Sequence, residues 1–396
     1  MQNAARQLFD AFLADRDSPN PLGKRKPHVG TPIHDLANID PIDLRESCLV
    51  VEPWGHVGKR PKDDSGVIAS ENIAYIVDQI LGVPTLIVPA WRTGVGNPRR
   101  FAALARSAML IAFEGGEPNV HEAESFTAAY PRSAATRCLV ELMLMGVPFV
   151  GICLSHQLAA QAHVELIREV VQRLETSGNP AFIAVANAIR QVGDNLPVKK
   201  GYGTVASSWK AETFAVAQNE QGSYANTQLH PYKHEPIEHV PAMVSDAHRL
   251  VSNEYDAIID AALSHENEIH IQTFHGNEVS EESIRFVCWA YQTIQAALKA
   301  YPTEAAASQE LHALLGLPLG VEILASTHDR DDKPLCEVAA TGTYWQGGQT
   351  AITTQFHPEL DHSLLTTSEG WRPSWTDMKR SDGIRLLVRM LRGCLN

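Results

Sequence analysis

Short apolar runs alternate with amphipathic helical patterns along much of this chain. The runs have the length of buried strands and cover residues 48–52, 85–88, 108–113 and 148–151. Between the first two, apolar residues recur at helical spacing as far as Leu81, after Ser70, which stands where a helix N-cap is expected. Because strands that alternate with helices form βαβ units, the pattern predicts an open, mostly parallel α/β sheet with helices on both faces.

Longer helical patterns follow residue 151. Apolar residues at helical spacing over 167–174 and 182–189, with a break at 177–180, predict a helical hairpin. A further helix is predicted after Ser280 and a terminal one after Ser381, with strands at 200–205, 268–274, 321–325 and 350–356. We therefore expect an N-terminal arm over residues 1–47 and one α/β domain over 48–396, with helical insertions at about 164–197 and 280–318.

The amino-acid composition limits which binding partners and which cellular compartment are expected for this chain. The chain has 396 residues, 44% of them hydrophobic, and a formal net charge of −13, which argues against binding nucleic acid or an anionic membrane. The six cysteines form no Cys-x-x-Cys pair, so we expect neither disulfides nor a metal site, and we expect no cofactor. No targeting signal or membrane span is evident, and a cytoplasmic location is expected.

The segment from Gly151 to Ser155 has the pattern of a nucleophile elbow. An apolar strand runs directly into helix-favouring residues, and small residues stand two positions before and two positions after Cys153. Such a turn would expose the sulfur at the carboxyl edge of the sheet, beside free N–H groups of a helix N-terminus. The N–H of Leu154 is then a candidate donor to an oxyanion. A lone cysteine at a strand end is usually a core residue, so the assignment needs a partner elsewhere.

That partner is predicted at the end of the last strong strand. His357 follows the strand over 350–356, and Glu359 stands two residues further on, within reach of one imidazole nitrogen. The other nitrogen would face the thiol, which completes a Cys–His–Glu triad. The glycine pair Gly115–Gly116 follows the strand over 108–113, so it belongs to the same edge of the sheet, where open α/β sheets bind ligands.

Together these motifs resemble those of class I glutamine amidotransferases. The resemblance rests on Gly151-Ile-Cys-Leu-Ser-His-Gln157 and Gln355-Phe-His-Pro-Glu359, supported by Gly115-Gly116, Gly201-Tyr-Gly203 and His275-Gly-Asn-Glu-Val279. It implies a flavodoxin-like fold and a γ-glutamyl thioester on Cys153, with His357 as acid and base and Glu359 as its orienter. It also implies an oxyanion hole from the N–H groups of Leu154 and of Gly115 or Gly116, and substrate contacts from Gln157, Gly201, Tyr202 and Gly203.

The activity implied by the resemblance is hydrolysis of the glutamine side-chain amide to glutamate and ammonia. Two alternatives stay open: a γ-glutamyl hydrolase of the same fold acting on larger amides, and a catalytically silent scaffold. Ser155 stands where the family usually has glycine and adds bulk at the elbow. No acceptor domain is evident, so ammonia would leave for water or for a separate synthase or acceptor subunit. The sequence leaves open whether the chain forms a homo-oligomer.

Overall fold

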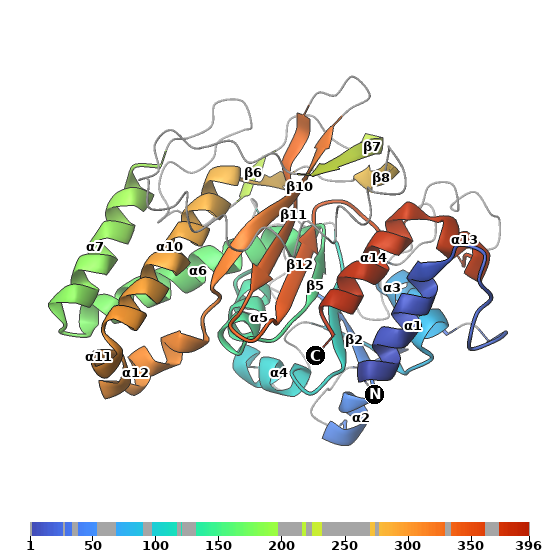
Figure 1. The fold of residues 1–396 in the computed structure, drawn as a ribbon, viewed down its shortest axis with the longest axis horizontal. Helices are drawn as coiled ribbons and strands as arrows, with labels where there is room; N and C mark the ends of the chain where they lie inside the picture. The colour runs from blue at the N-terminus through green and yellow to red at the C-terminus, as the bar shows by residue number, and fades with distance from the viewer. Residues whose placement is uncertain are drawn as a thin grey trace.

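A sheet of ten strands runs through the molecule (Figure 1). The computed structural model describes residues 2–26, 28–33, 39–53, 69–89, 97–116, 120, 132–196, 216–218, 224–231, 270–273, 277–328, 334–360 and 372–395. The strand order is β1-β3-β2-β4-β5-β12-β11-β10-β7-β8, and a separate two-stranded sheet pairs β6 (Val216–Gln218) with β9 (Asn277–Val279).

The parallel part of the sheet has a flavodoxin-like order. Its strands are β2 (Cys48–Glu52), β3 (Thr85–Pro89), β4 (Leu110–Phe113), β5 (Val150–Ile152) and β12 (Thr350–Thr354). They lie side by side as β3-β2-β4-β5-β12, which is the order 2-1-3-4-5 along the chain. The predicted α/β class is confirmed, and each of these strands overlaps an apolar run recognised in the sequence.

An antiparallel extension continues the sheet beyond β12. It consists of β11 (Pro334–Tyr344), β10 (Gly320–His328), β7 (Tyr224–Pro231) and β8 (His270–Thr273). β11 is not predicted from the sequence, because its apolar residues are interrupted by Glu, Ala and Gly and form no continuous aliphatic run. The strand forms through pairing with β10 and β12, which is not visible in its local sequence.

Helices cover both faces of the sheet. In β2, Leu49 and Val51 belong to one buried cluster, and Cys48 and Val50 belong to the other, as expected for a strand covered on both sides. The first face carries α4 (Pro98–Ala105), α5 (Arg132–Leu144), α6 (Leu154–Thr176), α7 (Pro180–Asp194) and α10 (Glu281–Ala300). The second carries α1 (Gln2–Ala14), α3 (Ala69–Leu81), α13 (Trp375–Arg380) and α14 (Asp382–Gly393).

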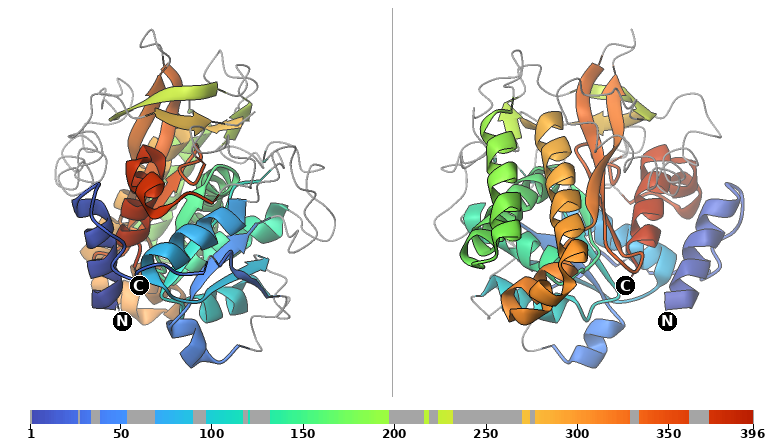
Figure 2. Two further views of the ribbon diagram at one scale, coloured as in Figure 1. Left: turned by 90° about the vertical axis from the view of Figure 1, so that its right-hand side faces the viewer. Right: turned by 60° about the vertical axis from the view of Figure 1, so that its left-hand side comes forward.

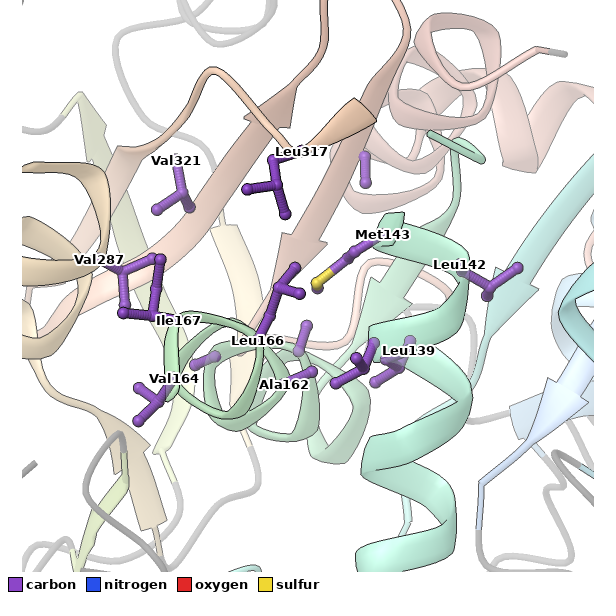
Figure 3. Close-up of a cluster of buried hydrophobic side chains, with 14 of the residues drawn as sticks. Leu139, Leu142, Met143, Ala162, Val164, Leu166, Ile167, Val287, Leu317 and Val321 are labelled. Atoms are coloured by element: carbon purple, nitrogen blue, oxygen red, sulfur yellow. The ribbon is translucent and has the colours of Figure 1, made fainter. Parts of the chain in front are cut away.

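The expected helical segments form a layer around the elbow helix. α6 packs against α5, α7 and α10, and Figure 2 shows α7 and α10 side by side. Short elements follow α10, namely α11 (Pro302–Ala307), α12 (Gln309–His312) and the 3₁₀ helix Ala313–Gly316. Figure 3 shows the cluster that joins this layer to the sheet: Leu139 and Met143 come from α5, Leu166 and Ile167 from α6, and Val287 from α10.

Serine residues lie at or near the starts of α10, α14 and α3. The helices predicted after Ser280 and Ser381 form, and the hydroxyls of these serines accept backbone N–H groups at the starts of α10 and α14. Ser70 was wrong as a cap: α3 already begins at Ala69, and the Ser70 hydroxyl donates to Glu52 Oε1 at 2.9 Å. The Ser70 hydroxyl therefore bonds the buried carboxylate of Glu52 on β2 instead of a backbone N–H of the helix.

The segment before β2 contributes an apolar helix face to the core. In α1, Phe9 and Phe12 have no exposed surface, and the helix packs against α14 and α3. The Phe12 ring meets Trp375 edge to face, with centroids 5.1 Å apart. Further along, β1 (Thr31–Pro32) pairs in parallel with β3, and α2 (Pro41–Arg45) leads into β2.

Candidate active site

Cys153 occupies a strained turn between β5 and α6. Its φ is 49° and its ψ is −104°, and among the described residues other than glycine it is alone in having a positive φ. Such backbone costs about 1–3 kcal/mol and persists where the surroundings enforce it. Here the Cys153 N–H donates to the carbonyl of Thr354 on β12 at 2.6 Å. The segment therefore has the conformation of a nucleophile elbow.

The small residues around Cys153 are needed for close packing. A Cβ atom added to Gly151 would lie 2.9 Å from Cγ2 of Thr353, inside van der Waals contact. On the other side, Ser155 is fully buried, and its hydroxyl donates to the carbonyl of Glu114 at 2.5 Å. The serine that departs from the family pattern is thus bonded to the loop that follows β4.

His357 and Glu359 lie beside the elbow because β12 pairs with β5. Nδ1 of His357 is 2.8 Å from Oε1 of Glu359, whose side chain has no exposed surface. The imidazole also forms a hydrogen bond with Cys153. Since Glu359 engages Nδ1, Nε2 is the nitrogen left for the sulfur. The structure therefore brings together the three residues that the sequence proposed as a triad, at two neighbouring strand ends.

The charge state of His357 follows from its neighbours. Burial of the ring lowers its pKa, but the Glu359 carboxylate and the Cys153 sulfur raise it more strongly. The net pKa of His357 lies well above its usual value. The imidazole consequently holds its proton at neutral pH, as an acid that must protonate a leaving amine requires.

Gly115 fills the space next to this pair. A Cβ atom added to it would lie 2.8 Å from Cε1 of His357 and 3.2 Å from Cβ of Cys153, so only glycine fits without displacement. Within the described part of the chain, the N–H of Gly115 donates to no acceptor. The N–H of Leu154, at the first position of α6, has no acceptor within its helix either. Both groups are available to a developing oxyanion.

Gln355 is a site residue that the sequence analysis did not assign. Its Nε2 lies 3.7 Å from the Cys153 sulfur, and its Oε1 accepts from Nε2 of Gln157 at 3.2 Å. Both carboxamides are buried. The available signal was position: Gln355 is two residues before His357 on the same strand end, but nothing local shows that its side chain reaches the sulfur.

Other candidate residues fall outside this cluster or outside the described residues. The predicted substrate contacts Gly201, Tyr202 and Gly203 belong to the second group, as do His275 and Gly276. Gly116 follows Gly115 and is partly exposed. Gln157 lies on the first turns of α6, and its Nε2 donates to Oε1 of Gln355.

His156 stands beside the elbow but points away from the triad. Its Nε2 lies 3.0 Å from the carbonyl of Val338 and its Nδ1 2.7 Å from the hydroxyl of Thr353. Because a carbonyl only accepts, Nε2 is the donor and Nδ1 accepts from Thr353 in the neutral ring. His156 therefore joins α6 to β11 and β12.

The remaining cysteines are buried away from this chemistry. Burial raises the pKa of Cys288 and Cys394 to about 12, and it raises the pKa of Cys48 and Cys138 as well. Cys336 is also buried. Cys48, Cys138, Cys288 and Cys394 are therefore protonated at neutral pH, and an added electrophile is expected to label Cys153 in preference to them.

A cleft of about 820 Å³ lies at the opposite edge of the sheet. Residues before β4, β5 and β12 line it, among them Met109, Val147 and Gln349, together with Arg45 and Arg106. Arg45 is in the last turn of α2 and Arg106 caps α4, so both offset the negative carboxyl ends of these helices. The strands separate this cleft from the Cys153 edge.

Replacing Glu359 with glutamine is expected to move the alkaline limit of turnover to lower pH. The carboxylate is the strongest factor that raises the pKa of His357, so its loss lets the imidazole release its proton at lower pH. The measurement is kcat/KM for amide hydrolysis against pH. The matched control is Glu141→Gln, which removes a buried carboxylate that pairs with Arg137 on α5 and should leave the profile in place. An unshifted limit in Glu359→Gln would contradict the assigned role.

No helix within the described ranges is long and apolar enough to cross a membrane. No protein-family model and no curated protein matches the chain.

Among solved structures, the chain is similar to a glutamine amidotransferase from Thermotoga maritima. The identity is 10%, the TM-score 0.36, and the match covers 80% of this chain and 77% of the other. It is also similar to the glutaminase domain of Trypanosoma brucei CTPS with bound acivicin, at 14% identity and a TM-score of 0.37, over 88% of this chain and 93% of the other. At these values the geometry of the site, rather than the likeness, supports the function proposed below.

Proposed function

We propose that this chain is a glutaminase of the class I amidotransferase type, which hydrolyses the side-chain amide of glutamine through a thioester on Cys153. One observation supports this most directly. Cys153, on a strained strand-to-helix turn, is hydrogen-bonded to His357, which is itself oriented by the buried Glu359. A nucleophile, a base and an orienter in one hydrogen-bonded line are what covalent amide cleavage requires.

The first half of the proposed reaction forms the thioester. The Cys153 sulfur attacks the amide carbon while its proton resides on Nε2 of His357, and the carbonyl oxygen becomes negatively charged. The N–H groups of Leu154 and Gly115 stabilise that oxygen. His357 then gives its proton to the amide nitrogen, the carbon–nitrogen bond breaks, and ammonia leaves.

The second half regenerates the free Cys153 sulfur. His357, now neutral, takes a proton from a water molecule as the water attacks the thioester carbon. The carbon–sulfur bond breaks, the sulfur leaves as a thiolate beside the protonated His357, and glutamate leaves. Throughout, Glu359 holds Nδ1 of His357, so that Nε2 keeps facing the sulfur.

The substrate is tested with the purified chain and a panel of amides. We expect glutamate and ammonia to be released from glutamine, with a higher kcat/KM than for γ-glutamyl amides of larger amines. A preference for the larger amides would replace the proposal with the γ-glutamyl hydrolase. Absence of turnover on the whole panel, together with no labelling of Cys153 by a glutamine-like electrophile, would favour the silent scaffold.

The fate of ammonia is a separate part of the proposal. A second subunit that consumes ammonia would raise the rate of glutamine hydrolysis when its own substrates are present. The assay is therefore repeated with candidate synthase subunits, and the stoichiometry of glutamate to aminated product is measured. A ratio near one indicates transfer, whereas free ammonia in the same amount as glutamate indicates a stand-alone glutaminase.

A further inference from the structure

Ser155 connects the elbow to the glycine loop through a buried hydrogen bond. Its hydroxyl donates to the carbonyl oxygen of Glu114 at 2.5 Å, and neither residue has exposed surface. On its other side, Glu114 is anchored by the sheet, because its N–H donates to the carbonyl of Val51 at 3.0 Å. The residue before Gly115 is thus fixed at both its N–H and its carbonyl.

That carbonyl belongs to the same peptide unit as the N–H of Gly115. A trans peptide is planar, and its C=O and N–H point in opposite directions. No cis peptide bond occurs within the described residues. Holding the Glu114 oxygen therefore fixes the direction of the Gly115 N–H.

Without the hydroxyl, little in the local sequence would fix this peptide. Glycine accepts φ of either sign, so the unit between residues 114 and 115 is free to rotate where no side chain restrains it. If this peptide rotated, its carbonyl oxygen would replace its N–H group on the side that faces away from Ser155. Since Gly115 packs against His357 and Cys153, that exchange would alter the polarity of the space beside the sulfur.

We propose that Ser155 is a positioning residue that holds the Glu114–Gly115 peptide in one orientation, so that the oxyanion hole is preformed in the free chain. The inference rests on the proposed function, because it assigns the Gly115 N–H to the oxyanion. It gives the serine at this position a role that glycine cannot fill, since glycine has no hydroxyl to bond the Glu114 carbonyl. The chain itself, rather than a bound partner, then determines that the N–H of Gly115 and not the carbonyl of Glu114 faces the oxyanion.

The kinetic test is Ser155→Ala, with Ser47→Ala as the matched control. Ser47 is also buried and also donates to a backbone carbonyl, that of Asp43, at 2.6 Å, but it lies before β2, at the opposite edge of the sheet. We expect kcat for glutamine to fall about tenfold or more in Ser155→Ala, with little change in KM, because the oxyanion exists only in the transition state. Ser47→Ala should keep the kcat of the unaltered chain.

Alkylation of Cys153 by iodoacetamide separates positioning from general damage. This displacement at carbon creates no oxyanion, so its rate should be the same in Ser155→Ala as in the unaltered chain. A parallel loss of alkylation and kcat would mean that the elbow itself is distorted, and would overturn the proposal. If Ser155→Ala does not fold, Ser155→Gly serves instead, since the elbow accepts small residues at this position.

Hydrogen exchange tests the orientation without using activity. Loss of the hydroxyl should speed exchange at the Gly115 amide, which belongs to the peptide that Ser155 holds, and Ser47→Ala should leave that amide unchanged. If the chain hydrolyses glutamine but Ser155→Ala keeps both kcat and the Gly115 exchange rate, the inference fails and the proposed function stands. If the chain is inert towards glutamine while the Gly115 amide exchanges faster in the variant, the proposed function fails and the restraint on the peptide stands.

Discussion

Cys153→Ala is expected to abolish glutamate release from glutamine, with a fall in kcat of at least about 10⁴-fold. Without the sulfur no thioester can form, and water held near His357 lacks the position of a covalent nucleophile. The measurement is glutamate release under saturating glutamine, together with mass spectrometry for a covalent adduct with a glutamine-like electrophile. The variant should form no adduct, and residual turnover within tenfold of the unaltered chain would contradict a covalent mechanism.

The control for this variant is Cys394→Ala. Cys394 is equally buried, and its sulfur contacts the carbonyl of Phe149 at 3.4 Å, at the opposite edge of the sheet. Its truncation should lower the melting temperature but keep kcat. Loss of activity in both variants would point to misfolding rather than to loss of the nucleophile.

The strain at Cys153 adds a readout that does not depend on activity. Alanine retains the Cβ atom and hence the unfavourable φ of 49°, whereas glycine adopts this backbone at little cost. Cys153→Gly should therefore unfold at a higher temperature than Cys153→Ala, by an amount worth about 1 kcal/mol. Equal melting temperatures would show that the turn is relaxed in solution.

His357→Ala is expected to lower kcat/KM by roughly 10²- to 10⁴-fold, the usual contribution of a positioned acid and base. The substitution removes the imidazole, which is both the base that takes the thiol proton and the acid that protonates the leaving nitrogen. Because the missing ring leaves a space beside Cys153, added imidazole should restore part of the activity. Rescue that rises with imidazole concentration would be the signature of an acid–base role.

The neighbouring histidine provides the control for that rescue. His156 is as buried as His357, but its two ring nitrogens bond Thr353 and Val338. His156→Ala should be less stable, because it leaves the Val338 carbonyl without its donor. Its activity should not respond to imidazole, and equal rescue of both variants would overturn the assignment of His357.

The sequence by itself determined most of the parallel core and the chemistry at its edge. Apolar runs such as 48–52 and 108–113 form strands because their residues bury well on both faces, and this preference is local. The elbow was recognisable for the same reason: a strand, a cysteine between small residues, and a helix stand in uninterrupted succession. His357 and Glu359 also lie close enough in the chain for their hydrogen bond to be anticipated.

The tertiary structure decided what depends on contacts between distant residues. Pairing of β12 with β5 brings His357 to Cys153, more than two hundred positions away in the chain, and it also brings Gln355 to the sulfur. The strand β11 forms where its backbone pairs on both sides, with β10 and with β12.

Ser155 is the clearest case of a role decided by the fold. In the sequence it is a small residue that adds bulk where glycine is usual. In the fold, β4 and the start of α6 approach so closely that the Ser155 hydroxyl meets the Glu114 carbonyl. A hydroxyl can bond any acceptor within reach, and only the packing of strand against helix determines which acceptor that is.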